Sequence, residues 1–136
     1  PEYLIEHHIN SVEILVQSKL EIIPTGYLLI DGGKETAVQR VSQTLPIEQD
    51  NIELAYKTAK AGEFLGKKLI YLEAGSGANQ HVSLEMVQYV AQNIDVPLIV
   101  GGGIRSMTTI QDIYSAGADL VVIGTAFEND HNFFSI

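Results

Sequence analysis

The sequence contains no cysteine and few basic residues, and both absences limit what the protein can do. Without cysteine there is no disulfide bond and no zinc site with thiolate ligands, which fits a location in the reducing cytoplasm. Eight lysines and arginines stand against 17 aspartates and glutamates, so the formal net charge is −9. Such a charge repels a polyanion, and we expect no general binding of nucleic acid. A small anion could still bind through local donors, such as helix N-termini or a bound metal ion.

Long apolar segments are also missing. No apolar run reaches the roughly 18 residues that a membrane-spanning helix requires, and no signal peptide is visible. Hydrophobic residues make up 46% of the sequence, enough for one folded domain over residues 1–136. Because the chain begins with Pro1 rather than methionine, we expect it to be part of a longer protein.

Four short apolar runs predict the strands of a parallel sheet. Each run is continuous rather than alternating, as in strands that are buried on both faces, and each ends in glycine or a polar turn. The predicted strands are Ile22–Ile30, Lys68–Glu73, Pro97–Val100 and Asp119–Ile123.

Segments with apolar residues at helical spacing separate these runs. Asn51 and Ser83 are candidate N-caps, and Gly66 is suited to end a helix. The segment from Gly32 to Gln49 is longer than a usual connection, and we interpret it as a functional loop with a short helix at Thr36–Val41. The longer predicted helices are Glu2–Ser18, Asn51–Gly66, Ser83–Gln92 and Thr108–Ala116.

Helices and strands therefore alternate, which predicts an α/β fold with right-handed crossovers between parallel strands. A TIM barrel of the (βα)8 type contains eight such units. Four strands with their helices would supply about half of that barrel, and we expect residues 1–136 to form its C-terminal half.

Glycine-rich turns end the last two predicted strands. Gly102 and Gly103 lie within Val100–Ser106, and Gly124 with Thr125 follows the next strand. Glycine lets the backbone approach an anion and direct N–H groups toward it, although it also suits an ordinary tight turn. TIM barrels place a phosphate site after their last two strands. Both motifs at this separation therefore predict a phosphate site.

An acidic residue lies at the end of the second predicted strand. Since side chains alternate along a strand, Tyr71 and Glu73 point to the same side, and they face the barrel interior if Leu72 faces the outer helices. A carboxylate there must be paired or functional. Glu73 could act as a general base, or it could be satisfied by a lysine or a backbone N–H group.

Other polar residues leave alternatives open. Asp31 could bind a metal ion or a hydroxyl group, but we expect it to cap the turn that follows it. Arg105 could contact phosphate or point into solvent. His7 and His8 are adjacent and would diverge by about 100° on a helix. The sequence thus indicates no metal-binding pair.

Several strings of residues, taken together, carry a family resemblance. The glycine motifs alone occur in many phosphate-binding barrels, but the combination of Thr25–Gly33 with Tyr71–Gly77 is far more specific. With Glu2–Asn10, Val100–Arg105 and Gly124–Ala126, they resemble geranylgeranylglyceryl phosphate synthase, also called phosphoglycerol geranylgeranyltransferase. The resemblance runs over nearly the whole chain.

The resemblance implies a prenyltransferase of lipid biosynthesis. In that family the hydroxyl group of sn-glycerol 1-phosphate attacks C1 of a polyprenyl diphosphate, such as geranylgeranyl diphosphate. Diphosphate leaves, and the product is an ether-linked phospholipid precursor. By resemblance, Glu73 would orient or deprotonate the glycerol hydroxyl. The implied substrate contacts are Tyr71, Leu72, Glu73, Ala74, Gly75, Ser76, Gly77, Gly102, Gly103, Gly124 and Thr125.

The resemblance also implies a magnesium ion and a possible homo-oligomer. The magnesium ligands would lie near the first strands of the barrel, so we assign none in this chain and expect the segment alone to be inactive. Two alternatives stay open. The first is another phosphate-barrel isomerase or lyase, with Asp31 and Lys34 as its candidate catalytic residues. The second is an inactive half-barrel that binds phosphate or self-associates through its sheet edges.

Overall fold

Four parallel strands form one sheet, and their order in the sheet is their order in the chain. The computed structural model describes residues 2–135. The predicted α/β class with a parallel sheet is confirmed. Along the chain the elements are α1 (Glu2–Ser18), β1 (Thr25–Leu29), α2 (Ala37–Ser42), α3 (Ile52–Phe64), β2 (Leu69–Glu73), α4 (Leu84–Asn93), β3 (Leu98–Gly101), α5 (Met107–Ala116), β4 (Leu120–Val122) and α6 (Thr125–Asn129).

The alternation of side chains along β2 divides the two faces of the sheet. Ile70 and Leu72 are fully buried, whereas Tyr71 is only partly covered. Leu72 pairs with Val100 on β3 and packs in the core formed with the helices. This confirms that Leu72 faces the helices, so Tyr71 and Glu73 point to the other face.

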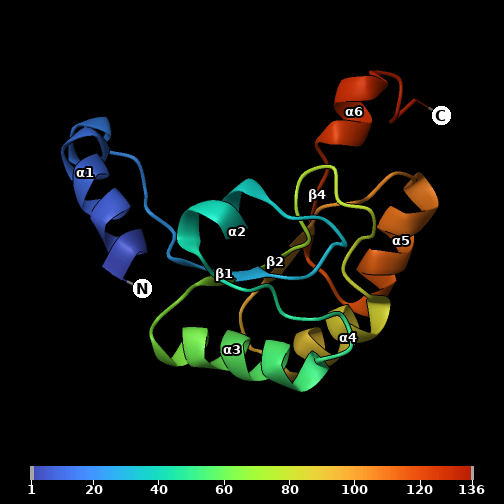
Figure 1. Ribbon diagram of the computed structural model, residues 1–136, viewed down its shortest axis with the longest axis horizontal. Coiled ribbons are helices and arrows are strands. Elements are labelled where there is room, and N and C mark those ends of the chain that lie inside the picture. Colours follow the sequence, from blue (N-terminus) through green and yellow to red (C-terminus); the bar gives the residue numbers. More distant parts are fainter. Residues whose placement is uncertain (1, 136) are drawn as a thin grey trace.

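The helices that share the core with Leu72 pack in sequence, α3 against α4 and α4 against α5. Figure 1 shows α3 and α4 along one side of the sheet and α2 on the opposite side. The small residues Ala55 and Ala59 of α3 are fully buried and let this helix lie close to the strands. Larger core side chains come from α4 and α5, namely Met86, Val87, Val90 and Ile113.

Side-chain caps set where the helices begin. The predicted caps are confirmed, since Asn51 accepts a hydrogen bond from Leu54 and Ser83 accepts one from Met86. Thr36 caps α2 in the same way, so it lies just before the short helix instead of within it. At the end of α3, Gly66 adopts a φ of +90°, a conformation that favours glycine.

The prediction for the first strand was wrong at its N-terminal end. β1 begins at Thr25, and the preceding Ile22 and Ile23 are more than half exposed. Pro24 separates them from the strand because it has no N–H group to donate, although its carbonyl accepts from Lys68 at 2.7 Å. Helix α6 was not predicted, because five residues are too few for a recognisable helical pattern.

Helix α1 lies apart from the sheet and from the other helices (Figure 1). Its apolar side chains, among them Ile9, Ile14 and Val16, are mostly exposed. In the part of the chain that the structure describes, no helix has the length and hydropathy needed to cross a membrane.

We expect Leu72→Ala to destabilise the fold by about 2–5 kcal/mol, because it leaves a cavity between the central strands and the helices. Leu45→Ala is the matched control, since Leu45 is 83% exposed in the connection after α2. That change should stay within about 0.5 kcal/mol. Urea unfolding measures both, and equal losses would contradict this placement of the core.

Candidate functional site

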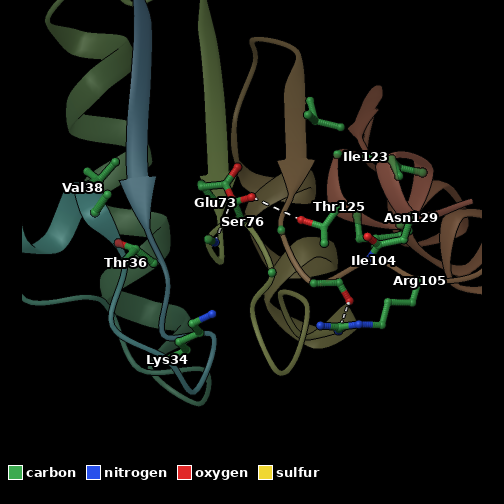
Figure 2. Close-up of a pocket in the computed structure, with 18 of the residues that line it drawn as sticks. Lys34, Thr36, Val38, Glu73, Ser76, Ile104, Arg105, Ile123, Thr125 and Asn129 are labelled. Carbon is green, nitrogen blue, oxygen red and sulfur yellow. Dashed lines mark hydrogen bonds between the residues drawn. The ribbon is translucent and has the colours of Figure 1, made fainter.

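A cavity of about 950 Å³ opens at the carboxyl ends of the strands, and we call it the strand-end cavity. The loops after all four strands line it, with Lys34 after β1, Gly75–Gly77 after β2, Gly102–Arg105 after β3 and Gly124 after β4. Figure 2 shows side chains from these loops around one space, with Thr36 and Val38 of the α2 region at one side. Parallel α/β sheets bind their ligands at this edge.

Glu73 lies at the end of β2 and is only 8% exposed. One of its carboxylate oxygens, Oε1, accepts a hydrogen bond of 2.7 Å from the backbone N–H of Gly75. A backbone N–H group therefore satisfies this oxygen, which was one of the alternatives left open by the sequence. Glu73 also lines the strand-end cavity, so this bond does not remove the carboxylate from the site.

The second carboxylate oxygen lies over the neighbouring strand, at Gly101. A Cβ atom built on Gly101 would lie 2.9 Å from Oε2 of Glu73 and 2.5 Å from the hydroxyl of Tyr71. The polar ends of both side chains therefore occupy the space that a larger residue at position 101 would fill. Glycine at this position lets the acid and the phenol meet above β3.

Two tyrosines surround this carboxylate. The rings of Tyr27 and Tyr71, which are paired in the sheet, meet edge to face with centroids 5.3 Å apart. Burial, hydrogen bonding to Glu73 and the negative charge of Glu73 raise the pKa of Tyr71. Burial and the same charge raise the pKa of Tyr27 to about 12. Both hydroxyl groups keep their protons at neutral pH, so they add no second negative charge beside Glu73.

The glycine turn after β3 packs closely against the turn after β2. Gly102 has a φ of +88°, and a Cβ atom there would lie 2.5 Å from the backbone nitrogen of Gly75. Gly103 has a φ of +69°, and its Cβ atom would lie 2.7 Å from the carbonyl of Gln80. Both glycines line the cavity. The turn therefore needs glycine for its conformation and for close packing, independently of any bound anion.

The turn after β4 is open toward the cavity. A Cβ atom on Gly124 would meet no atom within 4 Å, and Thr125 begins α6 directly after it. The hydroxyl of Thr125 lies 3.3 Å from that of Ser76 in the loop after β2. The contact between Ser76 and Thr125 brings the loops after β2 and β4 together at the cavity (Figure 2).

The family model described as the PcrB family matches residues 2–135. The chain belongs to the PcrB family. The resemblance seen in the sequence is confirmed, since two similar proteins carry the name geranylgeranylglyceryl phosphate synthase. The protein of that name from Flavobacterium johnsoniae is 58% identical over 134 residues, which are 98% of this chain and 55% of that protein. The one from Zunongwangia profunda is 62% identical over 129 residues, with 95% and 55% covered.

Solved structures agree with this membership of the PcrB family. The (S)-3-O-geranylgeranylglyceryl phosphate synthase of Thermoplasma acidophilum, in complex with sn-glycerol-1-phosphate, is 38% identical and gives a TM-score of 0.89. The similarity covers 98% of this chain and 53% of that one. This PcrB chain thus spans about half the length of the relatives that it matches.

Two predicted contact residues of this PcrB chain do not line the strand-end cavity. Leu72 and Ala74 are fully buried in the core beneath the sheet. Side-chain alternation puts them on the helix-covered face, opposite Glu73, so a substrate contact through these two side chains is not supported. The other predicted residues line the cavity, namely Tyr71, Glu73, Gly75, Ser76, Gly77, Gly102, Gly103, Gly124 and Thr125.

The structure also decides the alternatives for Asp31 and Arg105. Asp31 accepts a 2.8 Å hydrogen bond from the N–H of Gly33, so the predicted turn cap is confirmed. Arg105 donates to the carbonyls of Gly103 and Ala78, at 3.1 and 2.6 Å. Its guanidinium group ties the loops after β2 and β3 together, a role that neither sequence alternative included.

Several residues around the cavity were not predicted from the sequence. Tyr27 reaches it from β1, and Val38 reaches it from α2. The unusual length of the Gly32–Gln49 segment was the available signal for α2. The sequence offered no signal for Tyr27, because its place at the cavity depends on the register that pairs it with Tyr71, and only the structure supplies that register.

Acidic and histidine side chains do not cluster in the described part of the chain. Across residues 2–135, no group of three or more histidine, aspartate or glutamate side chains is placed to hold a metal ion. Asp31 is engaged with Gly33, and Glu73 is engaged with Gly75.

We expect Gly102→Ala to destabilise the protein more than Gly66→Ala. Both glycines have a φ near +90°, so each change carries a backbone cost of about 1–2 kcal/mol. A Cβ atom on Gly66 meets nothing within 4 Å, whereas one on Gly102 collides with Gly75 and Glu73. The collision should add about 1–3 kcal/mol. Urea unfolding of both variants measures the difference. An equal loss of stability would show that the turn after β3 is not in close contact with the turn after β2.

Proposed function

We propose that this chain forms the glycerol-phosphate-binding part of a prenyltransferase. The whole protein would join sn-glycerol 1-phosphate to a polyprenyl diphosphate, such as geranylgeranyl diphosphate, and release diphosphate. The observation that carries the proposal is the convergence of Glu73 with the glycine turns after β3 and β4 on one cavity. The Thermoplasma acidophilum relative, whose structure contains sn-glycerol-1-phosphate, supports this substrate.

The proposal includes a (βα)8 barrel for the whole protein. Four parallel strands in sequential order, with α3, α4 and α5 packed in sequence beside them, support this proposal. In a completed barrel, the face that carries Tyr71 and Glu73 would be its interior. The relatives, which are about twice as long as the matched segment, support this arrangement.

In the proposed reaction, Glu73 accepts the proton of the attacking glycerol hydroxyl. The hydroxyl oxygen forms a bond to C1 of the prenyl group as the bond from C1 to the diphosphate oxygen breaks, and diphosphate leaves with the electron pair. Oε1 of Glu73 stays bonded to Gly75, which fixes the direction of the carboxylate. Protonated Tyr71 lies beside this carboxylate and helps to position it.

The phosphate group would bind at the two glycine turns. Backbone N–H groups of Gly102 and Gly103 would contact it from β3, and those of Gly124 and Thr125 from β4. The hydroxyls of Ser76 and Thr125 lie 3.3 Å apart at the same side and supply further donors. With the phosphate held there, the reacting hydroxyl can reach Glu73.

Magnesium, the expected cofactor, would offset the charge of the leaving diphosphate in the whole enzyme. As the family resemblance implies, we propose that its ligands lie near the first strands of the barrel, outside residues 1–136. The cytoplasmic location that the sequence suggested and the homo-oligomeric state that the resemblance implied stay predictions.

The full-length protein tests the proposed activity. Incubation with sn-glycerol 1-phosphate, magnesium and radiolabelled geranylgeranyl diphosphate should yield a labelled product that extracts into butanol. The enantiomer sn-glycerol 3-phosphate is the control, because its C2 hydroxyl points in a different direction when its phosphate and terminal hydroxyl are placed in the same way. No product with any prenyl length, or turnover of a phosphorylated sugar instead, would overturn the proposal.

The variant Glu73→Gln tests the proposed base. Its kcat should fall by roughly 10²–10⁴-fold, because the amide cannot accept the hydroxyl proton. The amide oxygen can still accept the Gly75 N–H, so the Kd for glycerol phosphate should change little. Glu85→Gln, an exposed position in the first turn of α4, is the matched control. An unchanged kcat in Glu73→Gln would remove Glu73 from the mechanism.

A further inference from the structure

Lys34 borders the strand-end cavity from the loop between β1 and α2. A Cβ atom built on Gly77 would lie 3.9 Å from the ammonium nitrogen of Lys34 and 3.9 Å from the hydroxyl oxygen of Thr125. No further atom outside the adjoining residues comes within 4 Å of that point. The ammonium group of Lys34 and the hydroxyl of Thr125 therefore approach the same small region, next to Gly77.

The ammonium group of Lys34 has no partner within residues 2–135, since none of the ion pairs and side-chain hydrogen bonds there involves it. Two other cations line the cavity. The guanidinium of Arg105 is engaged with the carbonyls of Gly103 and Ala78. Arg40 lies in the last turn of α2 and does not come within 4 Å of the point above Gly77. Lys34 is thus the unpaired cation beside Thr125.

The negative charge around the cavity makes the ammonium group of Lys34 important for binding an anion. The chain carries a formal net charge of −9, and Glu35, Glu73 and Asp130 also line the cavity. A phosphate monoester with two negative charges would enter an unfavourable field if backbone N–H groups were its only donors. A mobile ammonium group supplies a full positive charge and three hydrogen-bond donors.

We propose that Lys34 binds the phosphate group of the glycerol phosphate from the β1 side, across from the glycine turns after β3 and β4. This inference rests on the proposed function and adds a residue that determines the preference for a phosphorylated polyol. Binding at Lys34 also gives the first strand of this chain a direct part in holding the substrate.

The variant Lys34→Gln, made in the full-length protein, tests the inference by titration calorimetry with sn-glycerol 1-phosphate. Its Kd should rise by about 10-fold or more at low ionic strength, since a charge-assisted hydrogen bond is lost. The ratio of variant to wild-type Kd should shrink as salt is added, because an exposed cation is screened. Lys34→Arg should restore most of the affinity.

The matched control is Lys68→Gln. Lys68 is exposed just before β2, at the opposite edge of the sheet, and its removal changes the net charge by the same amount. Its Kd should equal that of the wild type. Equal weakening in both variants would attribute the effect to the general field and overturn the assignment of Lys34.

The remaining outcomes separate this inference from the proposed function. A wild-type protein that binds no glycerol phosphate overturns the proposed function, and the role of Lys34 falls with it. Wild-type binding with an unchanged Kd in Lys34→Gln overturns the role of Lys34 alone. A raised KM for the prenyl diphosphate, with an unchanged Kd for glycerol phosphate, would assign Lys34 to the other substrate and contradict the inference.

Discussion

The hydrogen bond from the backbone N–H of Gly75 to the carboxylate of Glu73 is the contact on which the site depends. It fixes the direction of a buried acid and at the same time closes the turn after β2. A buried carboxylate is costly unless it is bonded, so this donor makes the position of Glu73 tenable. The turn needs glycine at 75, where φ is +104°, and at 102, where a Cβ atom would strike the Gly75 nitrogen.

A second set of bonds holds the loops in place around this contact. Gln49 donates to the carbonyls of Asp31 and His81, and it accepts from the N–H of Ser83. Arg105 performs a similar task between the loops after β2 and β3. These side chains bond to backbone groups of loops that are distant in sequence. The cavity is therefore shaped by a bonded framework and not by the glycine turns alone.

The two faces of the sheet have different roles, since one packs in the core and the other borders the cavity. One face of β2 directs Ile70 and Leu72 into the core with the helices, and the other directs Tyr71 and Glu73 toward the cavity. Because the alternation is strict, the two tasks fall on neighbouring residues of one short strand. A core substitution at Leu72 and a site substitution at Glu73 should thus act through different physical effects.

The sequence by itself determined the alternating α/β order, the caps at Asn51 and Ser83, and the positions of Glu73 and the glycine turns at the ends of strands. These features rest on local chemistry, since periodicity, capping and the freedom of glycine are properties of short segments. Family resemblance supplied the expected substrates. Only the tertiary structure decided that Leu72 and Ala74 turn away from the cavity, that Arg105 binds carbonyls, and that Lys34 reaches the region of Thr125. Each of these depends on how strands and loops far apart in the chain are brought together, which local patterns do not encode.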